Sequence, residues 1–246
     1  MFAAALGVPL DHPAPYRYPL LLAAVLLVPA VLAMLATRDT GEVPAEQAVG
    51  GAGPAPVALM ALVGLSMALR VPGEAAARTF FNVYLDAGLQ APTALIGALS
   101  AAGQLVAVPA ALVTPLLMAR WGISRTYVWA TLAMALCLLP LALIPHWSAA
   151  GLGFAGVISA SSMAFPAIVV YAMMIVPAAW RPTMSAAIEL AAGVSFLLAS
   201  LGGGYLIAYL GYPSLFLTSA ILAAAGAVAF WVCFRRPRGE LAHASA

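Results

Sequence analysis

Residues 213–234 read PSLFLTSAILAAAGAVAFWVCF, a stretch without a single charged side chain. A helix rises by about 1.5 Å per residue, so a stretch of this length suits a hydrocarbon core about 30 Å thick. The stretch does not alternate between apolar and polar residues, as the strands of a membrane barrel do. It is therefore predicted to be a membrane-spanning helix.

The same pattern recurs along the whole chain. Hydrophobic residues make up 65% of the 246 residues and charged residues only 7%, whereas soluble domains carry roughly a quarter charged residues. Hydropathy and helix-breaking residues divide the chain into seven apolar segments: 18–36, 56–85, 93–118, 127–145, 150–177, 183–210 and 213–234. We therefore expect an all-α integral membrane protein with about seven transmembrane helices.

The distribution of arginine supports this number of helices. Arginine near helix ends favours the cytoplasmic side, and only Arg17 falls on the side opposite to the others. The even-numbered connections and the C-terminal tail contain Arg38, Arg120, Arg125, Arg181, Arg235, Arg236 and Arg238. The N-terminus is thus predicted to lie outside and the C-terminus in the cytoplasm. Short loops and alanine-rich helices favour a bacterial plasma (inner) membrane.

Composition along the chain predicts four regions. Residues 1–36 form an N-terminal tail and a first helix, and residues 37–55, rich in Gly, Pro and acids, form a flexible cytoplasmic linker. Residues 56–234 hold six further helices, and residues 235–246 are a basic cytoplasmic tail.

Two loop regions within the six helices resemble each other at an offset of 89 residues. Pro115–Gly122 aligns with Gly204–Gly211, and a Leu, an Ala and a Gly match. Three helices separate the two copies, so they lie at opposite membrane faces, as inverted repeats require. The alternative is chance agreement among three common residue types.

Several degenerate motifs follow one another in a characteristic order. They are FFNVYLD at 80–86, RWGISR at 120–125 with Arg120, Gly122 and Arg125, Pro166, VPAAWR at 176–181, GGGYL at 202–206, and Gly211-Tyr212. This order resembles the C-terminal half of a major facilitator superfamily (MFS) transporter, together with the preceding helix and central linker. The acid that usually precedes the loop arginine is absent, because Met118 and Ala119 occupy that stretch.

The resemblance implies a six-helix bundle of two inverted three-helix repeats that works as a secondary transporter by alternating access. Substrate would lie near the midplane, against the second, third, fifth and sixth segments. The chain has no room for the family's first five helices, so we expect a fragment or a half-protein that needs a missing N-terminal half or a second copy. The alternative is a non-transporting membrane subunit or an inert remnant of a truncated gene.

The second segment contains the candidate site. Arg70, Glu74, Arg78 and Asn82 recur every four residues and share one helical stripe. Two guanidiniums flank one carboxylate, which leaves one positive charge in excess and indicates an anionic ligand. Pro72-Gly73 interrupts this helix and predicts a kink or a break there. Interrupted helices near the midplane are the usual position of a transporter binding site. Alternatively, Arg70 and Glu74 pair only to be tolerated in lipid.

Three polar residues in other segments are further candidates. Glu189 has small residues one turn to either side, and an unpaired acid in the membrane can carry a coupling proton. The alternative is an ion pair with Arg181 near the cytoplasmic end. Gln104 and Tyr171 are placed to face a central cavity or to bond a neighbouring helix.

The sequence argues against an enzyme. All three histidines fall in predicted loops or tails, and neither an HExxH metal motif nor a nucleotide-binding GxxxxGK[ST] loop occurs. We therefore expect no catalytic residue, cofactor or metal. Arginines scattered singly between apolar segments also argue against nucleic acid as a partner. The expected partners are the lipid bilayer, a small-molecule substrate and protons as the candidate coupling ion.

Overall fold

The computed structural model describes residues 21, 24–25, 28–29, 32 and 55–234. The six isolated residues belong to the predicted first helix and are helical. Residues 37–54 of the predicted linker and the predicted tail 235–246 lie outside the described residues. The chain divides into two units, Met1–Gly50 and Gly51–Ala246, and the second contains every helix discussed below.

Five helices in the described part of the chain are long and apolar enough to cross a membrane. They begin and end within a few residues of the predicted segments, and a π-helical turn (η1) and a 3-10 turn (η2) separate some of them. The elements are α4 Val57–Val83, η1 Tyr84–Gly88, α5 Thr93–Trp121, α6 Ile123–Leu143, α7 Trp147–Ile175, η2 Ala178–Trp180 and α8 Arg181–Phe234.

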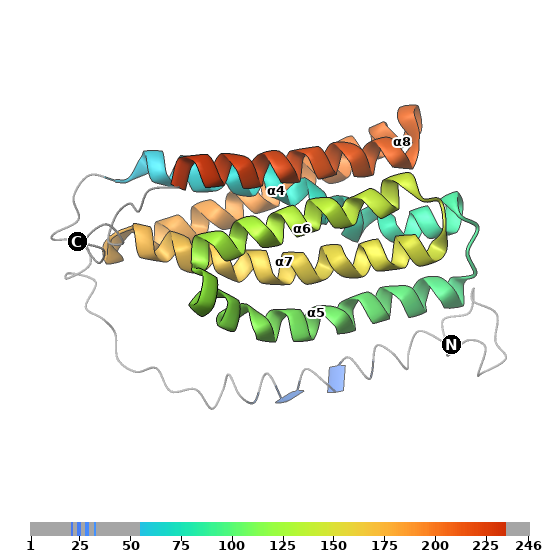
Figure 1. The fold of residues 1–246 in the computed structure, drawn as a ribbon, viewed down its shortest axis with the longest axis horizontal. Helices are drawn as coiled ribbons and strands as arrows, with labels where there is room; N and C mark the ends of the chain where they lie inside the picture. Colours follow the sequence, from blue (N-terminus) through green and yellow to red (C-terminus); the bar gives the residue numbers. More distant parts are fainter. Residues whose placement is uncertain (1–20, 22–23, 26–27, 30–31, 33–54, 235–246) are drawn as a thin grey trace. The chain divides into compact units, whose positions relative to one another are not determined.

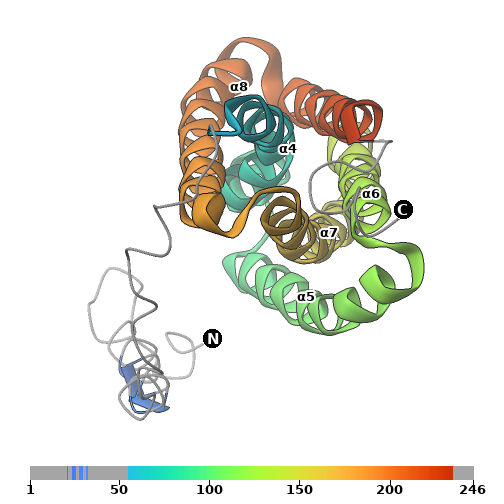
Figure 2. The ribbon, with the colours of Figure 1, turned by 90° about the vertical axis from the view of Figure 1, so that its left-hand side faces the viewer.

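Helix α8 consists of two arms that meet at Gly211. This glycine has a left-handed φ of 79° and a ψ of 175°, outside the helical region. A straight helix of 54 residues would be about 80 Å long, far more than the roughly 30 Å of a bilayer core. The arms correspond to the predicted segments 183–210 and 213–234. Viewed along the helices, they form separate columns beside α4 (Figure 2).

The helices run back and forth between two ends of one bundle (Figure 1). Helix α4 packs against α8, α6 packs against α7 and α8, and α5 packs against α7. The end where α4 begins is also the end where α5 meets α6 and where α7 meets α8. Arg120, Arg125 and Arg181 all belong to this end, so the described arginines of the connections gather on one side.

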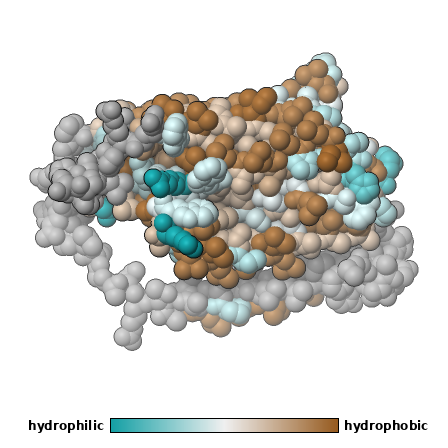
Figure 3. Space-filling view, viewed as in Figure 1, coloured by the Kyte–Doolittle hydropathy of each residue, from teal (hydrophilic) through white to brown (hydrophobic). Residues whose placement is uncertain are grey.

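The outside of the bundle is as apolar as its interior. Leu112 on α5 and Leu152 on α7 are 73% and 75% exposed, and apolar side chains cover much of the face in Figure 3. Inside, small residues let helices approach: a Cβ at Gly156 would lie 2.4 Å from Sγ of Cys137. Water would penalise such a surface, whereas lipid accommodates it.

Helix α4 continues through Pro72 and Gly73, so the predicted helix break is wrong. Proline leaves the carbonyl of Ala68 without its helical donor, and Ser195 on α8 supplies one, with Oγ 3.2 Å from that oxygen. Gly73 permits close packing, because a Cβ there would lie 3.0 Å from Cε of Met134 on α6. A hydroxyl of α8 thus replaces the backbone donor that α4 lacks at Pro72, and α4 remains helical there.

Candidate functional site

The charged residues of α4 lie at the middle of the bundle. Residues 72 and 73 are the centre of the apolar span Val57–Gly88, so Arg70 and Glu74 lie within one turn of it. Ser161 is the central residue of α7. Charge at this depth costs about 2.5 to 3.5 kcal/mol on insertion scales and requires a polar partner.

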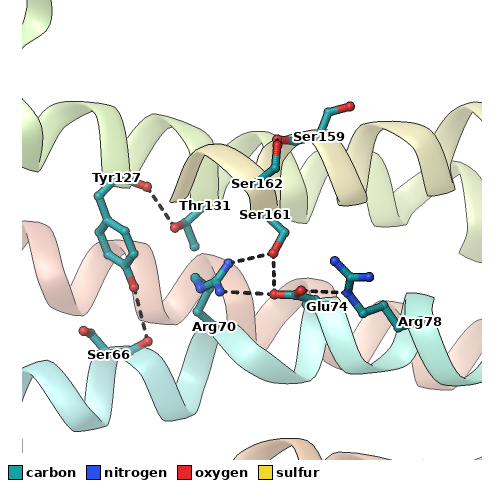
Figure 4. A network of polar contacts seen from close by, with 9 residues as sticks. All are labelled: Ser66, Arg70, Glu74, Arg78, Tyr127, Thr131, Ser159, Ser161 and Ser162. Carbon is teal, nitrogen blue, oxygen red and sulfur yellow. Dashed lines mark hydrogen bonds and ion pairs between the residues drawn. The ribbon is translucent and has the colours of Figure 1, made fainter. Parts of the chain in front are cut away.

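Each of these groups has such a partner (Figure 4). Nη2 of Arg70 lies 3.1 Å from Oε2 of Glu74, and Nη1 lies 3.2 Å from Oγ of Ser161. The Ser161 hydroxyl in turn donates to Oε2 of Glu74. Nε of Arg78 donates to Oε1 at 2.8 Å. One carboxylate therefore accepts hydrogen bonds from two arginines on its own helix and from a serine on α7.

The cluster carries one positive charge in excess. All three donors point at Glu74, so the arrangement requires it to be a carboxylate, and one negative charge faces two guanidiniums. Arg70 is 1% exposed, and its Nε is buried without a hydrogen-bond partner. Arg78 is 40% exposed, and only its Nε bonds to a described residue. Donor groups thus remain available on both arginines.

A cavity of about 470 Å³ opens onto this cluster. Its walls come from α4, α7 and the first arm of α8. Polar groups of Arg70, Glu74, Arg78, Ser161 and Ser162 lie on one side, and the remaining wall is formed by Met67, Val71, Phe165, Pro166, Ala192, Gly193 and Phe196. An apolar cavity with a few convergent polar groups is the usual form of a small-molecule site.

Asn82, the fourth residue of the predicted stripe, lies outside this cavity. Its Oδ1 accepts a hydrogen bond of 2.8 Å from Oγ of Ser100. This bond joins α4 to α5 on an exposed part of the bundle. The structure therefore brings Arg70, Glu74 and Arg78 together and places Asn82 in a contact between helices.

The candidates on other helices are dispersed. Gln104 is exposed on α5, outside the cavity lining. Tyr171 is 4% exposed, and its ring packs edge-on against Phe230 and Phe234 at centroid distances of 5.2 and 5.4 Å. Glu189 is exposed on α8, makes no hydrogen bond or ion pair with a described residue, and lies one turn before Gly193 of the cavity wall.

The residues of the predicted loop motif form the junction between α5 and α6. Gly122 separates the two helices with a φ of 88° and a ψ of 153°. Only glycine adopts this conformation at little cost. Arg120 lies in the last turn of α5 and Arg125 in the first turn of α6, and both are exposed.

Ser161 is the member of the site that sequence reasoning missed. It stands among Ser159, Ser161 and Ser162, a serine cluster at the centre of an otherwise apolar helix. That position was the available signal, because a hydroxyl in mid-membrane bonds a neighbouring helix or its own backbone. No group of three His, Cys, Asp or Glu residues in the described part of the chain could hold a metal ion.

The fold and the central charge cluster define a multi-pass α-helical membrane protein with an internal polar site. The model of the Major Facilitator Superfamily matches residues 63–246, more than half of the chain, so this protein belongs to that superfamily. Its members are transporters of small molecules rather than enzymes. Among curated proteins, no relative matched the chain.

Proposed function

We propose that this protein is a secondary transporter of a small anionic molecule, which binds at Arg70, Glu74, Arg78 and Ser161. The observation that carries the proposal is the cavity of about 470 Å³ at mid-membrane depth with two arginines and one carboxylate in its wall. A structural ion pair needs equal numbers of charges. The second arginine has a role if an anion completes the charge balance.

Arg78 is the group best placed to receive that anion. Its Nε is engaged with Glu74, and its two terminal amino groups make no hydrogen bond with a described residue. A planar guanidinium donates two parallel hydrogen bonds to a carboxylate or phosphate. Arg70, which is buried and bonded to both Glu74 and Ser161, holds Glu74 in place so that the carboxylate orients Arg78.

Transport would proceed by alternating access between two bundles. The six-segment bundle would consist of two inverted three-helix repeats, α4–α6 and α7–α8. Two glycines support this idea. Gly122 and Gly211 are 89 residues apart, which is the offset of the sequence repeat. Each joins two consecutive helical segments, and their φ values are 88° and 79°. Another chain or a second copy would supply the facing bundle, and rocking would expose the site to each side in turn.

Orientation and coupling belong to the same proposal. The arginine-bearing end of the bundle would face the cytoplasm of a plasma (inner) membrane, with seven spans in the whole chain. A proton would drive transport through Glu189 or Glu74. Glu189 fits this role better, because Glu74 already accepts bonds from three donors, and protonation would remove the negative charge that the two arginines face.

Ligand-dependent stability tests the proposal without knowledge of the substrate. Purified protein in mild detergent is heated with acetate, lactate, citrate or phosphate, and with neutral glycerol and glucose. A bound ligand stabilises the folded state by about 2.7 kcal/mol at a hundred times its Kd. We expect one anion to raise the melting temperature of the wild type. Arg78→Gln should lose this rise, and Arg181→Gln, which removes an arginine outside the cavity, should keep it.

Uptake then separates binding from transport. The stabilising anion is loaded into proteoliposomes, and exchange with labelled anion outside is followed for the wild type and Arg78→Gln. Exchange that is lost in Arg78→Gln supports the transporter. Binding without exchange would leave either the non-transporting membrane subunit or a half-transporter whose facing bundle comes from another chain. Stabilisation by neutral solutes alone would overturn the anion site.

A further inference from the structure

A second cavity, of about 750 Å³, lies between α5, α6 and α7. It is larger than the central cavity and shares no lining residue with it. It exists because α5 and α6 each pack along α7 but make few contacts with each other. Small residues in its wall, such as Ala133 and Gly156, keep the space open.

The lining of this cavity changes from charged to apolar along the helices. Arg120 and Arg125 line it where α5 meets α6. Ala133, two turns further along α6, lies about 12 Å deeper, and Leu117 and Met163 also contribute apolar wall. A charged end followed by an apolar compartment matches an amphiphile that has an anionic head and a hydrocarbon tail.

The two arginines at the mouth have no counter-ion among the residues that the structure describes. Neither makes an ion pair or a side-chain hydrogen bond with a described residue. Figure 3 shows hydrophilic side chains over the α5–α6 junction, next to apolar surface. Two guanidiniums on one cavity can bind a single phosphate from both sides. Basic pockets between transmembrane helices on the cytoplasmic side are suited to anionic lipid head groups.

The aromatic residues of the cavity also fit a lipid. Trp121 and Trp129 line the cavity and are 48% and 61% exposed. Tryptophan favours the level of the lipid head groups.

We propose that this cavity binds an anionic phospholipid of the surrounding bilayer. The phosphate lies between Arg120 and Arg125, and one acyl chain occupies the apolar part beside Ala133. The site is separate from the central cavity, so its occupant is neither the transported molecule nor its competitor. A bound lipid fills the gap that α5 and α6 leave and joins the two helices at the junction formed by Gly122.

Tryptophan quenching by brominated lipids tests this assignment, since Trp121 and Trp129 border the cavity. Full-length protein is reconstituted in phosphatidylcholine vesicles that contain increasing fractions of dibrominated phosphatidylglycerol or dibrominated phosphatidylcholine. Each arginine near an anionic lipid contributes a factor of about five to association. We expect a saturable quenching component that prefers the anionic lipid by roughly 25-fold, the product of the two factors.

Three variants identify the site. The double variant Arg120→Gln/Arg125→Gln should lose the preference for anionic lipid, and Arg181→Gln, at the same end of the bundle but outside the cavity, should keep it. Ala133→Phe fills the apolar part from an exposed position and should remove the saturable component for both lipids. Circular dichroism and melting curves establish that each variant is folded.

Several outcomes would overturn the proposal. Equal quenching by the two lipids, or a preference that survives in the double variant, would show that the arginines do not bind a lipid phosphate. A preference that Ala133→Phe leaves unchanged would place the lipid outside the cavity. Displacement of the anionic lipid by millimolar glycerol phosphate would identify a site for soluble anions instead.

Discussion

Oγ of Ser195 lies 3.2 Å from the carbonyl oxygen of Ala68, the oxygen that Pro72 leaves without a helical donor. The bond crosses from the first arm of α8 to α4, at the level of the central charge cluster. It explains why α4 remains helical where the sequence predicts a break. It also ties the helix that carries Arg70 and Glu74 to the helix that closes their cavity.

Removal of this hydroxyl should destabilise the protein only while the proline is present. Ser195→Ala leaves the Ala68 carbonyl without a partner in an apolar environment, at a cost of about 1 kcal/mol. Pro72→Ala restores the backbone donor, so in that background Ser195→Ala should cost much less. A double-mutant cycle of unfolding free energies in mild detergent measures the difference. Equal costs in the two backgrounds would mean that the hydroxyl does not replace the missing donor.

Loss of Glu74 should destabilise the protein more than loss of Arg78. Glu74→Gln leaves the buried Arg70 without a counter-ion and should destabilise the protein by about 3 kcal/mol, as breaking a buried pair does. Arg78→Gln removes a guanidinium that is 40% exposed and should cost less than about 1 kcal/mol.

Thermal unfolding of both variants and of Glu74→Gln/Arg70→Met compares these costs. The double variant removes both buried charges and should recover part of the stability lost in Glu74→Gln. A cost for Arg78→Gln as large as that for Glu74→Gln would contradict the assignment of Arg70 as the buried member and Arg78 as the ligand-facing member of the cluster.

Replacing glycine by alanine should lower stability at the two turns between helices but not within a helix. Gly122 and Gly211 have left-handed φ values, so Gly122→Ala and Gly211→Ala should each lower stability by about 1 to 2 kcal/mol. Gly97 is helical, and a Cβ added there would meet no atom within 4 Å. Gly97→Ala should therefore be neutral or stabilising by up to about 1 kcal/mol. Melting temperatures compare the three variants, and equal losses at all three positions would refute this account.

Replacement of the two membrane acids should affect proton coupling differently. Glu189→Gln removes an acid without a described partner and should flatten the dependence of uptake on pH while uptake of the anion persists. Glu74→Gln disrupts the binding cluster and should lower uptake at every pH. Uptake into proteoliposomes, measured at several pH values for the wild type and both variants, makes the comparison. A pH dependence that neither substitution changes would exclude both residues as proton carriers.

The approximate bounds of the apolar helical segments in the described part of the chain could be predicted from the sequence. Lipid leaves a backbone amide no partner except its own helix, so an uncharged stretch such as 213–234 has only one structure available to it. Arg70 and Glu74 could also be identified from the sequence. Placing a charged side chain in the middle of an apolar helix costs free energy, so such residues indicate a polar site. These inferences need only local composition and spacing.

The partners of those charges depend on the tertiary structure. Ser161 lies 87 residues from Glu74 in the sequence, and no local pattern connects the two. The sequence does not distinguish Tyr171 from Gln104 as a polar candidate. In the structure, the Tyr171 ring packs against Phe230, whereas the Gln104 side chain is exposed on the outside of α5. The face that a uniformly apolar helix turns inward is set by packing against its neighbours, because its own hydrophobic pattern does not distinguish one side from another.

The sequence by itself thus determined that the chain is a bundle of membrane helices with buried charge on its second segment. Only the tertiary structure decided that α4 stays continuous, since the donor that completes it comes from Ser195 on another helix. It also decided which charges share a cavity and where a second cavity opens between α5 and α6. Local hydrogen bonding and hydrophobicity act along the chain, whereas cavities and polar clusters arise from side chains that only the packing of separate helices brings together.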